Sequence, residues 1–98
     1  MVIVKVVKTE EELQLAYEVR KKVFVDEQGV PEHLELDEFD SSSIHFIVQD
    51  GGDTIAAARL RELETGVGKI ERVSVLKEQR GNHLGVLIME HIESYARE

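Results

Sequence analysis

Hydrophobic and polar positions along this chain follow two periodicities, one typical of strands and one typical of helices. Residues 2–7 form an apolar, β-branched run, which predicts a strand with at least one buried face. Residues 44–49, 54–63 and 69–76 carry further strand patterns, separated by short turns that contain glycine. The turn at 50–53 holds two glycines that can adopt positive φ, so the strands on either side are predicted to form a hairpin.

Two other segments repeat their apolar residues at helical spacing. Residues 10–25 carry apolar side chains every three to four positions, and Thr9 with Glu12 forms a capping-box pattern at their start. Residues 28–31 end this helix, because proline disfavours helical backbone at the residue before it. Residues 84–95 repeat the pattern and predict a second helix near the C-terminus.

The segment between the first helix and the second strand is more polar. Residues 32–39 show weak helical spacing, which predicts a short helical turn, and residues 40–43 predict a loop. The expected order is therefore β-α-(short α)-β-β-β-α. This order is typical of an α/β protein of the α+β type, with a mixed, mostly antiparallel sheet and helices on both faces. We expect residues 1–98 to form a single domain, since the length leaves no room for a second.

Charge and composition narrow the classes of function. Twenty acidic against twelve basic side chains give a net charge of −8, which argues against a protein that binds nucleic-acid phosphates. Seven of the acids, and no lysine or arginine, lie in residues 26–40, so the rest of the chain is close to neutral. The apolar runs are too short to span a bilayer, and zero cysteines exclude disulfides and thiolate metal sites. We expect a cytoplasmic protein that binds no membrane, and no metal, because the four histidines lack metal-ligand spacing.

The segment between the last strand and the last helix has the composition of an anion-binding loop. Arg80, Gly81 and Gly85 precede or open the helix, where unpaired main-chain N–H groups and the helix dipole favour anions. Small residues let a pyrophosphate approach the main chain, and Arg80 adds charge-assisted hydrogen bonds. The alternative interpretation is an ordinary strand-to-helix turn with a surface arginine. No Gly-Lys-Ser/Thr follows, so the loop is not a nucleotide P-loop.

Residues 70–75, followed by 80–85 and an apolar helix, resemble motif A of the GNAT N-acetyltransferase superfamily. That motif reads Gln/Arg-x-x-Gly-x-Gly/Ala at the end of the fourth strand. A second block, residues 20–31 leading to Glu35 and Asp37, is similar to a small bacterial subgroup of GNAT proteins. The resemblance covers nearly the whole chain and implies an acyl-CoA N-acyltransferase-like fold. Members of the family usually continue with a fifth strand and a fourth helix, so the resemblance also implies a domain that lacks its usual C-terminal strands and helix.

The resemblance implies an enzyme that moves an acetyl group from acetyl-CoA directly to a primary amine, with no acyl-enzyme. Ser74 therefore need not be a nucleophile. Glu71, upstream of the loop on the fourth strand, is the candidate general base, and an exposed strand carboxylate paired with a lysine is the alternative. The fourth-strand main chain would pair with the pantetheine arm, and the loop would hold the pyrophosphate. This assigns cofactor binding to Val73, Ser74, Val75, Arg80, Gly81, Asn82, His83, Leu84 and Gly85.

Several features leave alternatives open. His83 stands where motif A has its middle glycine, and histidine is tolerated there less well than glycine if the position needs positive φ. A missing fifth strand would leave an unpaired edge, which favours pairing with another strand or a homodimer.

The resemblance places the acidic segment 26–40 beside the acceptor, which predicts attraction of a small cationic amine. The alternative is that the segment is an ordinary solvated surface. His45 is interpreted as a polar edge residue. The alternative function is an inactive fragment of this fold that binds CoA or self-associates.

Overall fold

Four strands and two α-helices lie in the part of the chain that the computed structural model describes, which is residues 2–31, 39–64, 66–81 and 83–96. The strands form one sheet in the order β1-β2-β3-β4, and each neighbouring pair runs antiparallel. The predicted class, α+β with a mostly antiparallel sheet, is confirmed, although the described strands contain no parallel pair. In chain order the elements are β1 (Val2–Val6), α1 (Glu10–Arg20), β2 (Ile44–Asp50), β3 (Asp53–Glu64), β4 (Val67–Val75) and α3 (Leu84–Ala96).

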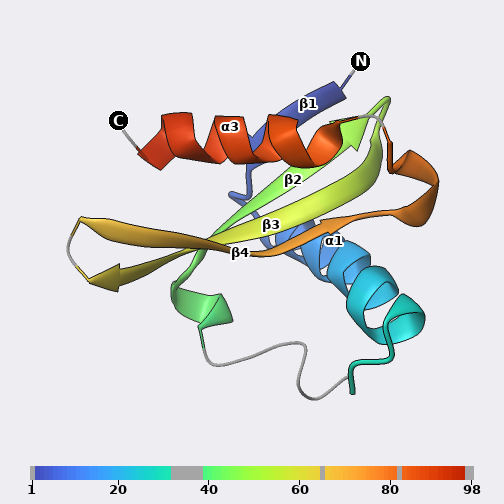
Figure 1. The fold of residues 1–98 in the computed structure, drawn as a ribbon, viewed down its shortest axis with the longest axis horizontal. Helices are drawn as coiled ribbons and strands as arrows, with labels where there is room; N and C mark the ends of the chain where they lie inside the picture. Colours follow the sequence, from blue (N-terminus) through green and yellow to red (C-terminus); the bar gives the residue numbers. More distant parts are fainter. Residues whose placement is uncertain (1, 32–38, 65, 82, 97–98) are drawn as a thin grey trace.

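The two helices cover opposite faces of this sheet (Figure 1). Successive residues of a strand point to opposite faces. In β2, Phe46 therefore packs in the core beneath α3, whereas Ile47 packs in the core beneath α1. Ile88 and Ile92 of α3 and Ala16 of α1 are fully buried in these two cores. The apolar stripes that predicted the helices are thus the faces that bind the sheet.

The start of α1 follows the predicted capping pattern. The side-chain oxygen of Thr9 accepts a hydrogen bond from the main-chain N–H of Glu12 at 3.1 Å. The Glu12 carboxylate in turn accepts from the main-chain N–H of Lys8 and pairs with the Lys5 ammonium, each at 2.8 Å. The hydrogen bonds from Lys5 and Lys8 hold the pKa of Glu12 below its ordinary value. These contacts connect β1 to the first turn of α1.

The predicted end of this helix at Val25 is wrong. After Arg20 the chain continues as a π-helical segment, Lys21–Glu27, and Gly29 then turns it with a φ of 76°. Winding of this kind is rare and is found often at functional sites. The segment brings Glu27 to the loop that precedes α3, as described below.

The connection to β2 differs from the prediction where the structure describes it. The short helical turn predicted over residues 32–39 lies almost entirely outside the described residues. The loop predicted at 40–43 is instead a 3-10 helical turn, Asp40–Ser42. Serine-rich segments favour turns of this kind, because their hydroxyls bond to the main chain. Here the Ser43 hydroxyl donates to the main-chain oxygen of Phe39 at 2.7 Å.

The hairpin between β2 and β3 forms as predicted. Gly51 and Gly52 have φ values of 61° and 98°, and Asp50 lies opposite Asp53 across the turn. β4 begins at Val67, two residues before the predicted start. β3 and β4 thus form a long second hairpin, whose turn end projects from the sheet (Figure 1).

Candidate functional site

An extra residue in β4 bends this strand beside the predicted cofactor-binding residues. In the register with β3, Arg72 and Val73 together face the single residue between Ala57 and Arg59. Arg72 adopts a φ of 54°, which non-glycine residues rarely do. Such β-bulges re-aim side chains and occur often next to active sites. The bulge leaves Glu71 on one side and the stretch predicted to bind pantetheine on the other.

The side chains of this second stretch point into the protein. Val73 and Val75 pack against the core beneath α3, and Ser74 is 1% exposed. The Ser74 hydroxyl donates to the main-chain oxygen of Ala57 at 3.3 Å. The hydroxyl is therefore buried and bonded to the main chain of β3. The main chain at the outer edge of β4 has no strand partner among the described residues.

The loop between β4 and α3 has two residues at positive φ. Gly81 has a φ of 91° and His83 a φ of 59°. Position 83 thus has the positive φ that the sequence left as a condition, and a histidine adopts it. The main-chain N–H of Leu87 donates to the His83 carbonyl at 3.1 Å, so α3 begins directly after this residue. Asn82 lies outside the described residues.

A cavity of about 300 Å³ lies against this loop. A Cβ atom added at Gly81 or Gly85 would meet no atom within 4 Å, so the main chain there borders open space. Among the residues that line this cavity are six of the nine predicted to bind the cofactor. The residues that line it are Val75, Gln79, Arg80, Gly81, His83, Leu84, Gly85 and Val86.

The Arg80 side chain is held on both sides. Its Nε–H donates to the Val75 carbonyl at 3.1 Å, and its two terminal nitrogens donate to the Glu27 carboxylate, Nη2 at 2.8 Å. The hydrogen bond from Arg80 lowers the pKa of Glu27, and the same bond raises the pKa of Arg80. Sequence reasoning missed this partner, because no local signal connects two residues so far apart in the chain.

The candidate base, Glu71, lies among three cations. Arg59 donates to its Oε1 from Nη2 at 2.8 Å and from Nε at 3.2 Å. Arg61 and Lys69 lie 3.2 Å and 3.5 Å from the carboxylate. Partial burial raises the pKa of Glu71, but Arg59, Arg61 and Lys69 outweigh it and leave the pKa below its ordinary value. The lysine partner of the alternative interpretation is present, but the carboxylate is partly buried and not exposed, and two arginines also pair with it.

Charged side chains continue from Glu71 into the protein interior. Arg59, 2% exposed, also binds the Asp40 carboxylate at 3.0 Å, and Asp40 binds Arg20 at 2.6 Å. This buried cluster of Arg20, Asp40, Arg59 and Glu71 crosses from α1 to β4. Sequence reasoning missed it, although an arginine within the apolar pattern of residues 54–63 was a signal. Asp40 is thus one acid of the segment 26–40 that is buried and not part of a solvated surface.

The interpretation of His45 as a polar edge residue is wrong. β2 lies between β1 and β3, and His45 is 5% exposed. Its Nε2 lies 2.8 Å from the main-chain oxygen of Asp40, and its ring meets that of Tyr17 edge to face. Burial lowers the pKa of His45, and the contact with Asp40 opposes this only in part. Its Nδ1 has no hydrogen-bond partner among the described residues.

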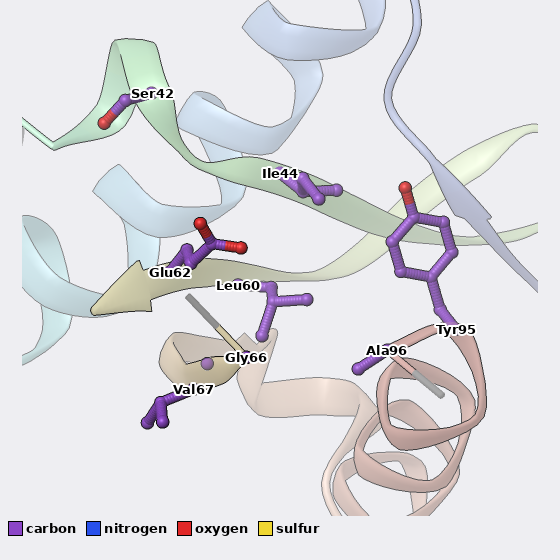
Figure 2. Close-up of a pocket in the computed structure, with 9 residues that line it drawn as sticks. Ser42, Ile44, Leu60, Glu62, Gly66, Val67, Tyr95 and Ala96 are labelled. Carbon is purple, nitrogen blue, oxygen red and sulfur yellow. The ribbon is translucent and has the colours of Figure 1, made fainter. Parts of the chain in front are cut away.

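A second cavity, of about 540 Å³, lies at the other end of α3 (Figure 2). Tyr95 and Ala96 of α3, Ile44 of β2 and the turn end of the β3–β4 hairpin line it. The two cavities lie at opposite ends of the 13-residue α3, which is roughly 20 Å long at 1.5 Å per residue. None of the predicted site residues lines this second cavity.

Comparison with known proteins assigns the family. The model of the acetyltransferase (GNAT) family matches residues 8–98. The chain belongs to the GNAT acetyltransferase family. It is 43% identical over 91 residues to the uncharacterized N-acetyltransferase YjcF of Bacillus subtilis, a match that covers 93% of this chain and 64% of YjcF. The chain thus spans slightly less than two thirds of the length of this relative.

Solved structures agree with the assignment of a GNAT fold. An acyl-CoA N-acyltransferase from Pseudomonas aeruginosa matches with a TM-score of 0.85 and 28% identity, over 98% of this chain and 69% of that one. ElaA of Escherichia coli matches with a TM-score of 0.85 and 22% identity, over 98% and 70% of the two chains. The predicted acyl-CoA N-acyltransferase-like fold is therefore confirmed. No helix in the described part of this GNAT chain is long and apolar enough to cross a membrane.

Proposed function

We propose that this GNAT chain binds acetyl-CoA and takes part in direct transfer of the acetyl group to a primary amine. One observation carries the proposal: Gly81 and His83, both at positive φ, line one cavity with Val75 at the end of β4 and with the start of α3. Helix N-termini bind phosphate through unpaired N–H groups and the helix dipole. A strand end beside such a site offers main-chain groups to the extended arm that continues from the phosphates.

The residues at this loop fit a pyrophosphate. The open space above Gly81 and Gly85 admits phosphate oxygens close to main-chain N–H groups. We propose that the loop holds the pyrophosphate and that the main chain of Val73 and Val75 pairs with the pantetheine arm. Acetyl-CoA supplies the thioester. A β4 N–H that donates to the thioester oxygen would stabilise the negative charge that develops there.

For the general base we propose Glu71, the β4 carboxylate that lies just before the bulge. Its lowered pKa leaves it ionised at neutral pH, so it can accept a proton, but the pairs with Arg59, Arg61 and Lys69 make it a weaker base than an unpaired carboxylate. A base role predicts that Glu71→Gln loses turnover while acetyl-CoA binding is kept. If Glu71 only pairs with Arg59, the variant would lose stability and keep its turnover number.

The acceptor is proposed to be a small, cationic primary amine. Of the acids in segment 26–40 that the structure describes, Glu27 and Asp40 are bound by arginines. Attraction of an amine would therefore depend on the other acids of the segment. Such attraction weakens as ionic strength rises. A Michaelis constant for a diamine that does not change between low and high salt would contradict it.

Calorimetric titration of the full chain with acetyl-CoA tests the cofactor site. We expect saturable binding that is lost or much weakened in Arg80→Glu, because the variant places a negative charge beside the phosphates. Glu90→Gln, at an exposed position of α3, is the control and should bind as the wild type does. No binding by the wild type at millimolar acetyl-CoA would overturn the proposed function.

The alternative function is an inactive CoA-binding or self-associating fragment. The observation that favours it is the outer edge of β4, which has no strand partner among the described residues. Pairing of two such edges would give the predicted homodimer, which sedimentation equilibrium would detect as a concentration-dependent mass. CoA binding without release of free CoA in the presence of any amine would support this alternative. A cytoplasmic location stays a prediction.

A further inference from the structure

Glu27 and Arg80 form an ion pair between two parts of the chain that are 53 residues apart in sequence. We propose that Glu27 is a positioning residue for the cofactor loop: it holds the Arg80 guanidinium against the Val75 carbonyl and so fixes the loop in the shape that binds the pyrophosphate. This inference rests on the proposed function, because it concerns how that same site binds coenzyme A.

The geometry of Arg80 supports a positioning role. A guanidinium has five N–H donors in a rigid plane. One donates to Val75 and one on each terminal nitrogen donates to Glu27, so the plane is fixed from two directions. Gly81, with a φ of 91°, follows directly in the chain. Fixing Arg80 to the end of β4 therefore fixes the point from which the loop turns.

The opposite charges of Glu27 and Arg80 also support a positioning role. The Glu27 carboxylate cancels the charge that Arg80 would otherwise present to a phosphate. Attraction of the anion is then left to the main-chain N–H groups of the loop and the start of α3. Arg80 therefore acts on the ligand mainly through the conformation of the loop. This differs from a direct phosphate contact, and the two roles predict different effects of removing Glu27.

The neighbouring acid, Asp26, provides a matched control. It belongs to the same π-helical segment but makes no ion pair with any residue that the structure describes, and it lines a groove with Lys22 and Lys77. Glu27→Gln and Asp26→Asn remove the same charge from adjacent positions. A long-range effect of charge on an anionic ligand would therefore be similar in both variants, and it would strengthen binding in both.

The first experiment is calorimetric titration of the full chain with CoA. We expect Glu27→Gln to weaken binding by about three- to fivefold, the upper range for an exposed ion pair. Asp26→Asn should bind CoA as tightly as the wild type or slightly more tightly. Equal effects of the two variants, or tighter binding by Glu27→Gln, would overturn the proposal.

A double-mutant cycle then separates a shared role from two independent ones. If Glu27 acts through Arg80, the double variant Glu27→Gln/Arg80→Gln should bind CoA no more weakly than Arg80→Gln alone. Additive losses of affinity would contradict a positioning role, because they would mean that each side chain acts on the ligand by itself.

Hydrogen exchange of the Arg80 side chain, measured without CoA, tests this inference separately from the proposed function. In nuclear magnetic resonance spectra, the Nε–H of Arg80 should exchange slowly with water in the wild type and in Asp26→Asn, and faster in Glu27→Gln. Unchanged exchange in Glu27→Gln would overturn the inference whatever the CoA titrations show. Slow exchange in a wild type that binds no CoA would instead overturn the proposed function.

Discussion

Asp40 and Arg20 form a salt bridge of 2.6 Å in which both residues are buried: Arg20 is 0% exposed and Asp40 6%. The same carboxylate binds Arg59 at 3.0 Å. The Asp40 carboxylate therefore pairs with one arginine from α1 and with one from β3. Buried charges are costly when a partner is removed, because the remaining charge keeps its desolvation penalty.

Asp40→Asn is expected to destabilise the protein strongly. The variant takes away the negative charge that Arg20 and Arg59 share, and breaking a buried pair in this way costs about 3–5 kcal/mol. Urea unfolding followed by circular dichroism measures the free energy of unfolding. Glu90→Gln, at an exposed position of α3, should stay within about 0.5 kcal/mol of the wild type. An equally small change in Asp40→Asn would show that the cluster contributes little to stability.

Stability is expected to fall as the pH drops from 7 to 5. Burial lowers the pKa of His45, so the unfolded chain binds a proton near the ordinary value of 6.5 that the folded chain takes up only at lower pH. This contribution is fully present above pH 6.5 and is lost below it. In His45→Gln the slope of unfolding free energy against pH should be smaller over this range. His91→Gln, at an exposed position of α3, should keep the wild-type slope.

A second loss of stability is expected at more acidic pH in both histidine variants. The pKa values of Glu12, Glu27 and Glu71 lie below the ordinary value of 4.5, so their contributions are present above that pH. These contributions are lost as the pH falls through the lowered values. A single transition near pH 6.5, with no further loss below 4.5, would contradict these ion pairs.

His83→Gly is expected to stabilise the protein. His83 has a φ of 59°, and this left-handed conformation costs an L-residue about 1–2 kcal/mol that glycine avoids. We expect a gain near 1 kcal/mol in thermal or urea unfolding, with CoA binding kept or tightened. Gly81→Ala, at a φ of 91°, should have the opposite effect on stability. Loss of stability in His83→Gly would mean that the imidazole makes a contact worth more than the strain.

Ser74→Ala is expected to keep most of the acetyl-transfer rate of the wild-type chain. The Ser74 hydroxyl donates to the Ala57 carbonyl, and the proposed transfer needs no acyl-enzyme. The expected cost is about 1 kcal/mol of stability from the lost hydrogen bond. Release of free CoA in the presence of an amine measures the rate. A loss of about 10³-fold or more would indicate a nucleophile and overturn direct transfer.

The sequence by itself predicted the features that depend on neighbours in the chain. The strands, the cap of α1 at Thr9 and the glycine turn of the β2–β3 hairpin all follow from local patterns and backbone sterics. The order of the elements and the motif before α3 were enough to indicate a GNAT fold, which the family match confirms.

The tertiary structure alone decided which polar side chains meet. Arg80 meets Glu27, Asp40 lies between Arg20 and Arg59, and His45 is buried because β2 has a strand on each side. The local pattern identifies the partner in none of these contacts, because the partners are brought together only by packing of the sheet and helices. The acidic segment 26–40 looked like one feature in the sequence. In the fold, Glu27 pairs with Arg80 at the loop before α3, whereas Asp40 is buried between Arg20 and Arg59.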